Sequence, residues 1–234
     1  MAGEFRGAVF VHGAGGGGWE WAAWARVFSA AGIAVAAPDL RPAAAGLAET
    51  TLADYSMQVS HWLDAVPRPR VLVGASLGGL LAAMSADRAD ALVLVNPMPP
   101  GGLPAAPASP PVVPWGRRAS LEGTRRALPG ADDAAALFAF RRWRDESGAA
   151  LDQARAGVAL ARPAVPVLLL ISEADRDVPS QVSLDFAKAW DATAWRIPGG
   201  HVDPLLGRGA PTLAHHTLTW LKMGSENINV SNTA

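Results

Sequence analysis

Hydrophobic and polar positions divide the first hundred residues into blocks of two kinds. Four short runs are almost entirely apolar and rich in Val, as expected of strands buried on both faces: residues 8–11, 33–37, 71–73 and 91–95. The longer stretches between them are typical of helices: residues 19–31, 55–66 and 80–86. Strand and helix in alternation predict an α/β chain with a mostly parallel, doubly wound sheet.

This alternation stops in the middle of the chain. Residues 97–114 contain eight prolines and cannot continue as a helix or a central strand. Residues 121–160 are rich in Ala, Leu and Arg and are broken at Pro129-Gly130 and Ser147-Gly148, which predicts two or three short helices. We therefore expect residues 97–162 to form a helical cap insertion over one end of the sheet.

The alternation returns in the last third of the chain, at residues 165–171, 181–190, 194–197 and 212–221. A length of 234 residues suits one domain. We expect a single domain over residues 1–222, with a core formed by residues 7–96 and 163–222. Residues 223–234 are rich in Asn and Ser and are expected to be a flexible tail or a remnant of cloning.

Composition narrows the classes of function. The chain has no cysteine, which excludes disulfides, thiolate catalysis and Cys-ligated metal sites. Its formal net charge of -1 lacks the basic excess that nucleic acids and anionic membranes attract. No apolar run approaches the ~20 residues of a membrane-spanning helix, and residues 1–6 lack the pattern of a signal peptide. We expect a soluble, cytoplasmic protein without nucleic-acid or membrane partners.

The motif Gly74-Ala75-Ser76-Leu77-Gly78 fits the pattern G-x-S-x-G. An apolar strand precedes it and a helix of small residues follows it, which is the context that a nucleophilic serine at a sharp turn requires. Glycines on both sides of the serine avoid steric clashes at so tight a corner. The motif predicts Ser76 as a nucleophile.

A serine needs a base to take its proton and an acid to orient that base. His201 follows a predicted strand, in Gly199-Gly200-His201, and Asp175 follows the strand at residues 165–171. The chain order Ser76, Asp175, His201 is the order expected of this type of site. We predict His201 as the general base and Asp175 as the acid, with Asp177 left open as an alternative acid.

The remaining candidates suit these roles less well. Three histidines fall within predicted helices and are expected to be solvated or packing residues: His61, His215 and His216. His12 adjoins the first strand and is expected to brace the glycines that follow it. Asp203 lies too close to His201 in sequence to be a comfortable partner.

Glycines follow the first strand in the segment His12-Gly13-Ala14-Gly15-Gly16-Gly17-Gly18. Such a loop can direct backbone N–H groups at an oxyanion, and the expected donors are the N–H groups of Ala14 and Leu77. A phosphate-binding loop is the alternative. The segment lacks the Gly-Lys-Ser/Thr ending of a P-loop, and only Asp39 offers an acidic residue after the next strand, so a dinucleotide site is disfavoured.

Several of these residues resemble the opening of a known family: His12-Gly13-Ala14, Gly17, Trp19, Trp21, Gly32 and Pro38-Asp39-Leu40. With the candidate catalytic residues in matching contexts, the chain resembles the α/β-hydrolases that include plant methylesterases and hydroxynitrile lyases. The resemblance covers residues 7–95 and 165–221 and is weak over 97–162. It implies an α/β-hydrolase fold and a Ser-Asp-His triad.

The resembling lyases carry a lysine beside the histidine, where this chain has Val202, and the two lysines present, Lys188 and Lys222, fall on predicted helices. This favours a serine carboxylesterase that hydrolyses small or medium carboxylic esters through an acyl-enzyme on Ser76, with no metal or cofactor. Thioester, lactone or amide hydrolysis stays open. So do a non-catalytic small-molecule binding protein of the same fold and, on the strength of nine tryptophans, an interaction protein.

The substrate pocket is expected between the sheet and the cap. Four aromatic residues of the cap could line this pocket or could only anchor the cap to the core: Trp115, Phe138, Phe140 and Trp143.

Overall fold

The computed structural model describes residues 5–223, and its centre is a six-stranded sheet with the order β2-β1-β3-β4-β7-β8. All neighbouring strands are parallel, so the predicted sheet is confirmed. The strands are β1 (Gly7–Val11), β2 (Ala34–Ala36), β3 (Arg70–Ala75), β4 (Ala91–Val95), β7 (Val167–Ser172) and β8 (Thr193–Ile197).

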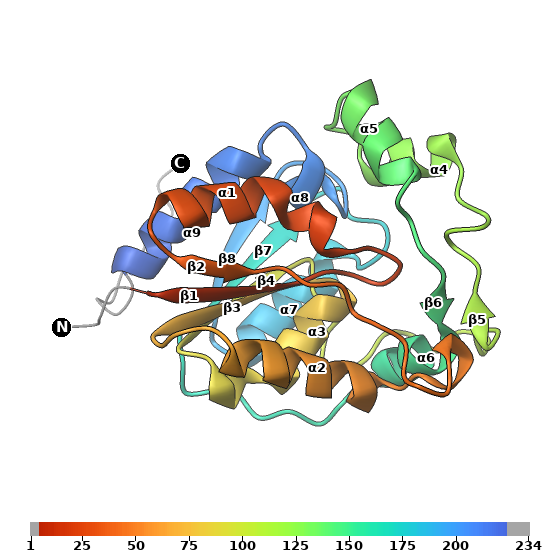
Figure 1. Ribbon diagram of the computed structural model, residues 1–234, viewed down its shortest axis with the longest axis horizontal. Helices are drawn as coiled ribbons and strands as arrows, with labels where there is room; N and C mark the ends of the chain where they lie inside the picture. The colour runs from red at the N-terminus through yellow and green to blue at the C-terminus, as the bar shows by residue number, and fades with distance from the viewer. Residues whose placement is uncertain (1–4, 224–234) are drawn as a thin grey trace.

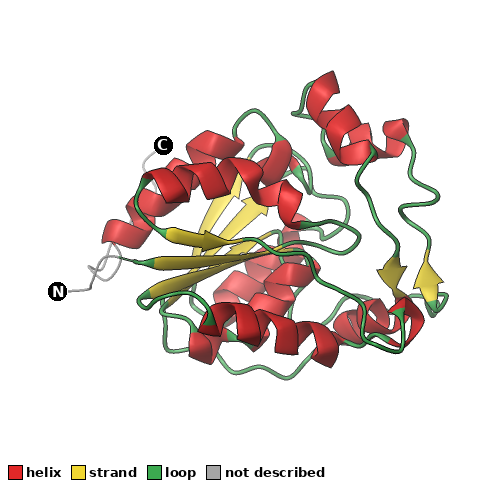
Figure 2. Cartoon of the chain, viewed as in Figure 1, coloured by secondary structure: helices red, strands yellow, loops and turns green. Residues whose placement is uncertain are grey.

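Helices cover both faces of the sheet (Figures 1 and 2). One face carries α1 (Ala22–Ala30), α8 (Asp203–Leu206) and α9 (Ala210–Met223), and the other carries α2 (Leu52–Asp64), α3 (Leu77–Met84) and α7 (Ser180–Ala189). Because side chains alternate along a strand, consecutive residues feed two separate cores. In β1, Phe10 packs with the α1 and α9 side chains, whereas Val9 packs with those of α2 and α3. This double burial explains the continuous apolar runs of the sequence.

Several helices begin earlier than the apolar pattern predicts. α2 begins at Leu52 rather than at residue 55 because Thr51 and Asp54 form a capping box. α3 begins at Leu77 rather than at residue 80, directly after Ser76. The short helix α8 was not expected at all, and its proline lies in the first turn, where a missing N–H is tolerated.

Residues 97–162, which we call the cap, contain three helices, where two or three were expected, at the end of the sheet away from the two termini (Figure 1). The helices are α4 (Leu121–Ala127), α5 (Asp133–Phe140) and α6 (Gly148–Ala156). A small antiparallel ribbon of β5 (Val112–Val113) and β6 (Glu146–Ser147) was not predicted. Two-residue strands are too short to leave a periodic signal in the sequence.

The C-terminal helix extends one residue into the segment predicted to be a tail. α9 continues to Met223, and the rest of the predicted tail, residues 224–234, lies outside the described residues. Within residues 5–223, every helix is too short or too polar to cross a membrane. The exact division between core and cap stays a prediction.

Candidate active site

Ser76 occupies a sharp turn between β3 and α3. It is the single residue between the last residue of the strand, Ala75, and the first of the helix, Leu77. Its backbone has φ 53° and ψ -120°, a conformation that residues other than glycine rarely adopt. The Ser76 N–H donates to the Val95 carbonyl at 3.0 Å, and the Ser76 carbonyl accepts from the Met98 N–H at 3.0 Å. These bonds hold a strained serine at the carboxyl end of the sheet.

The glycines of the motif have the steric role that was predicted. A Cβ at Gly74 would collide with the carbonyl of Gly78. A Cβ at Gly78 would in turn collide with the carbonyls of Val11 and His12. Both glycines are therefore required for α3 to begin directly against β3 and the end of β1.

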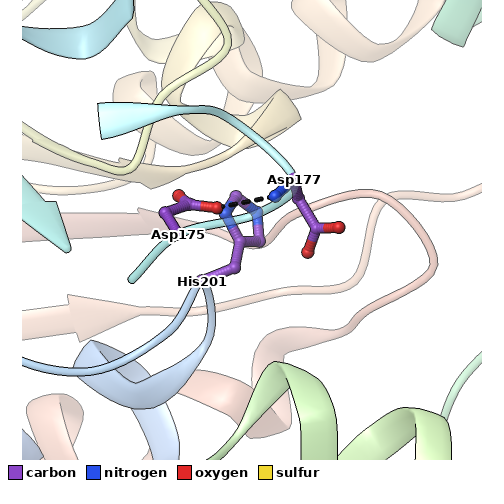
Figure 3. Close-up of side chains that lie close together, drawn as sticks. All are labelled: Asp175, Asp177 and His201. Carbon is purple, nitrogen blue, oxygen red and sulfur yellow. Dashed lines mark hydrogen bonds and ion pairs between the residues drawn. The ribbon is translucent and has the colours of Figure 1, made fainter. Parts of the chain in front are cut away.

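His201 and Asp175 form a hydrogen-bonded pair (Figure 3). The His201 Nδ1 lies 2.7 Å from the Asp175 Oδ2, and the two side chains are 11% and 1% exposed. This bond places the proton of the neutral imidazole on Nδ1 and leaves Nε2 free to accept a proton. Burial lowers the pKa of His201, but the hydrogen bond and the charge of Asp175 outweigh it, so that the pKa lies above its ordinary value. The geometry suits a base oriented by an acid.

Asp177, the alternative acid, has a different environment. Its backbone N–H and that of Val178 donate to the Asp175 Oδ1 at 2.9 and 3.0 Å, which fixes the Asp175 carboxylate toward the imidazole. The Asp177 side chain is directed away from the Asp175 carboxylate (Figure 3). Asp175, Asp177 and His201 offer oxygen and nitrogen atoms within 4.8 Å of one another, a spacing that a metal ion could use. Because Asp175 and His201 bond to each other directly, the cluster fits an acid–base pair better.

Two buried side chains hold the loop that carries His201, residues 198–202, called here the histidine loop. The Asn96 Nδ2 donates to the His201 carbonyl at 2.8 Å and to the Ser172 Oγ at 2.9 Å. The Asp203 carboxylate accepts the Gly200 N–H at 2.7 Å and the Gly130 N–H at 3.0 Å. Asp203 thus supports the loop and does not pair with the imidazole. The sequence had disfavoured this pairing because Asp203 lies so close to His201.

Residues 12–18, called here the glycine loop, lie beside Ser76. A Cβ on Gly13 would be 3.2 Å from the Ser76 Cβ. His12 is buried, contacts the Gly13 carbonyl through Nδ1 at 2.8 Å and accepts the Leu40 N–H through Nε2 at 2.8 Å. Burial lowers the pKa of His12 to about 4, so the ring is neutral at pH 7. His12 therefore braces the loop, as predicted.

The proposed oxyanion donors have N–H groups available. Within residues 5–223, the Ala14 N–H donates to no backbone or side-chain acceptor. Leu77 is the first residue of α3, and the N–H of a first helical residue has no acceptor inside its helix. Their assignment as an oxyanion hole stays a prediction.

The cap contacts the glycine loop through two polar residues. The Arg144 N–H donates to the Gly15 carbonyl at 2.7 Å, and the Arg144 Nε donates to the Gly16 carbonyl at 2.6 Å. The Glu146 Oε2 accepts the Gly15 N–H at 2.9 Å, while its Oε1 accepts the Tyr55 hydroxyl at 2.6 Å. The position of the glycine loop therefore depends on the cap.

A cavity of about 790 Å³ lies between the sheet and the cap, where the pocket was expected. Ser76 and His201 both line it, and so do Trp115 and Trp143 of the cap. Phe138 instead packs edge-to-face on Trp19, at 5.6 Å between ring centroids, and does not reach the wall. Trp143 also packs edge-to-face on Trp19, at 5.4 Å between ring centroids, so it both lines the cavity and anchors the cap.

The histidines and lysines that the sequence analysis excluded from the site lie away from this cavity. His61, His215 and His216 are exposed on α2 and α9, and Lys188 and Lys222 lie on α7 and α9. Val202, by contrast, is buried and lines the cavity beside His201, which places an apolar side chain there instead of a lysine.

Sequence reasoning missed the residues that act through long-range contacts. Arg144 and Glu146 lie in the cap, about which the sequence said little. Glu20 lines the cavity and is only 3% exposed, although it is an acidic residue between two tryptophans. An acidic residue inside an otherwise apolar segment was the feature of the sequence that could have identified Glu20 as a site residue.

Comparisons with known proteins agree with this arrangement. Residues 8–214 match the profile of a family described as "Alpha/beta hydrolase family". A pyrethroid hydrolase from Sphingobium faniae JZ-2 is 19% identical with a TM-score of 0.74, over 95% of this chain and 99% of that one. A methylesterase from Arabidopsis is 16% identical with a TM-score of 0.72, over 93% and 99%. A variant of tomato methylketone synthase I is 15% identical with a TM-score of 0.75, over 94% and 98%. No curated protein matches the sequence. The predicted fold is confirmed.

Proposed function

The chain belongs to the α/β-hydrolase family, and from this premise we propose that it is a serine hydrolase that cleaves carboxylic esters through an acyl-enzyme on Ser76. One observation carries the proposal. A serine in a strained turn faces the same cavity as a buried histidine whose Nδ1 is hydrogen-bonded to an aspartate. Backbone strain of this kind persists where the surrounding structure holds a residue for function. The names of two of the similar structures, a methylesterase and a pyrethroid hydrolase, also favour ester hydrolysis.

The reaction would begin with attack of the Ser76 Oγ on the ester carbonyl carbon while His201 Nε2 takes the hydroxyl proton. The Ala14 and Leu77 N–H groups would hold the oxyanion that forms. When the tetrahedral intermediate collapses, His201 gives its proton to the oxygen of the leaving alcohol. Water, deprotonated by His201, then attacks the acyl-enzyme and releases the acid and the free serine. Asp175 stabilises the imidazolium in both steps.

A single experiment tests the nucleophile and begins to define the substrate. Wild-type protein is incubated with a fluorophosphonate probe and weighed by intact-mass spectrometry, and hydrolysis of p-nitrophenyl esters of increasing acyl length is followed in parallel. We expect one label per chain, no label on Ser76→Ala, and a decrease in kcat of at least about 10⁴-fold in Ser76→Ala and His201→Ala.

Thermal melting shows whether both variants are folded. A folded Ser76→Ala protein that keeps its wild-type rate contradicts the proposal. A folded wild type that is neither labelled nor active favours a small-molecule binding protein of the same fold. Thioester, lactone and amide analogues of the best ester rank the alternative acyl bonds.

A further inference from the structure

The cavity contains an acidic side chain that this mechanism does not use. Glu20 lies in the short turn Gly18–Trp21 that follows the glycine loop, and it lines the cavity together with Gly13, Ser76 and His201. Its side chain is 3% exposed, and its Oε2 has no hydrogen-bond partner within residues 5–223. A buried carboxylate oxygen that accepts no hydrogen bond is unfavourable in the ionised form, so the environment of Glu20 favours either a proton or a ligand at this oxygen.

The Glu20 carboxyl lies against the glycine loop itself. A Cβ on Gly16 would collide with the Glu20 carboxyl group, which would then have to move from its present position. The Gly16 N–H donates to the Gly13 carbonyl at 3.2 Å, which closes the turn containing Ala14. The carboxyl is therefore packed on the segment that supplies a proposed oxyanion donor.

The charges around Glu20 are few. The backbone N–H groups of Gly17 and Gly13 face the carboxyl and favour its ionised form, and so do the charges of His201 in the histidine loop and Arg144 in the cap. Burial is the largest influence and outweighs them together, raising the pKa of Glu20 to about 8. At pH 7 most of the protein therefore carries a neutral carboxylic acid at this site.

We propose that Glu20 is a further catalytic residue that, as an un-ionised carboxylic acid, donates a hydrogen bond to the carbonyl oxygen of the substrate beside the Ala14 and Leu77 N–H groups. This inference rests on the proposed function. A neutral acid in an apolar pocket can donate a hydrogen bond to developing negative charge, whereas a carboxylate would repel the same charge. The site would consequently lose activity when Glu20 ionises.

Three variants separate the parts of this proposal. Glu20→Gln keeps the size of the side chain and a donor but cannot ionise, Glu20→Met keeps the size without a donor, and Glu49→Gln is a control at an exposed glutamate. On the best p-nitrophenyl ester at pH 7, we expect Glu20→Gln to keep kcat within about threefold and Glu20→Met to lose about 100-fold, with little change in KM, as for other oxyanion donors. Glu49→Gln should match the wild type.

The pH profile provides a second measurement. In the wild type, kcat/KM should decrease with the loss of one proton above pH about 8, and Glu20→Gln should lack this decrease. The role of Glu20 is contradicted if Glu20→Met has the same kcat as the wild type, or if kcat/KM of Glu20→Gln still decreases above pH about 8. Either result leaves the proposed function intact. Absence of both turnover and Ser76 labelling refutes the two proposals together.

Thermal stability tests the state of the carboxyl without any substrate. The unfolded chain loses the Glu20 proton near the ordinary value of 4.5, and the folded protein loses it near 8. The folded state holds the extra proton between these values, so the free energy of unfolding of the wild type decreases as pH rises through this window. Relative to the wild type, the melting temperature of Glu20→Gln should therefore increase by at least about 5 °C between pH 5 and 9. A constant difference shows that the carboxyl ionises normally and overturns the inference.

Discussion

The sheet and the cap are built on different principles. On the sheet side, the central strands are buried at every position, and Ser76 and Asp175 follow the ends of β3 and β7. On the cap side, α5 leaves Leu137 and Phe138 37% and 39% exposed. The difference teaches that the proposed reacting groups depend on packed backbone, whereas the cap influences them through a few polar contacts with the glycine loop and the histidine loop.

The largest effect expected from testing this contrast is on the sheet side, at Asp175. Asp175→Asn should decrease kcat by about 10³–10⁴-fold, because the amide no longer holds the imidazole in the required tautomer. Asp177→Asn is the matched control and should stay within about fivefold of the wild type, since the Asp177 carboxylate does not bond to His201. Equal losses in both variants contradict the assignment of the acid.

The pH dependence of these variants sharpens the same point. His201 must be neutral to accept a proton, and Asp175 raises its pKa. In the wild type, kcat/KM should therefore decrease as pH falls through this raised value. Removal of the negative charge lowers the pKa, so the acid limb of Asp175→Asn should lie at lower pH. An acid limb at the wild-type pH would show that Asp175 does not act on the base.

A pair of leucines compares the stability of the sheet and the cap. Leu94 of β4 is fully buried and Leu137 of α5 is 37% exposed. Leu94→Ala should lower the free energy of unfolding by about 3 kcal/mol, through lost burial and a residual cavity, and the melting temperature by about 10 °C. Leu137→Ala should change stability by less than about 0.5 kcal/mol. Denaturant unfolding measures both, and similar losses would mean that the cap is packed as tightly as the sheet.

The smallest effect concerns the contact between the cap and the glycine loop. Glu146→Gln should decrease kcat about tenfold with little change in KM, because the amide nitrogen that replaces one oxygen cannot accept a hydrogen bond. Either the bond from the Gly15 N–H or those from the Tyr55 hydroxyl and the Ser147 N–H would be lost. Glu122→Gln, at an exposed glutamate of α4, is the control and should be silent. An effect on KM alone would place Glu146 in substrate binding instead of loop positioning.

The strands of the sheet could be predicted from the sequence because each central strand is buried on both faces and is therefore a continuous apolar run. Ser76, Asp175 and His201 were found for a related reason. Residues that follow parallel strands meet at one edge of the sheet, so their order along the chain determines that they lie near one another. The structure places all three at that edge, and their catalytic roles stay predictions.

The rest of the site could not be found in this way. The bond between Glu146 and Gly15 joins residues separated by 131 positions, and neither residue lies in a pattern that identifies the other. The role proposed for Glu20 depends on burial and on an Oε2 atom that has no hydrogen-bond partner among residues 5–223, and only the packing around it determines both. Helix starts were missed where a cap, as at Thr51, or a steric turn, as at Ser76, decides the boundary rather than periodicity.

The contacts of Asn96 relate the assembly of the site to the order in which the chain is synthesised. Its backbone is left-handed, with φ 44°, and its amide bonds to Ser172 and to the His201 carbonyl, both of which lie much later in the chain. At about 5–20 residues per second, a ribosome releases His201 on the order of ten seconds after Ser76. On the proposed mechanism, the serine has no base throughout this interval, and the Asn96 amide lacks both of its acceptors. The growing chain would then be unreactive toward esters until His201 has been added and the histidine loop has folded.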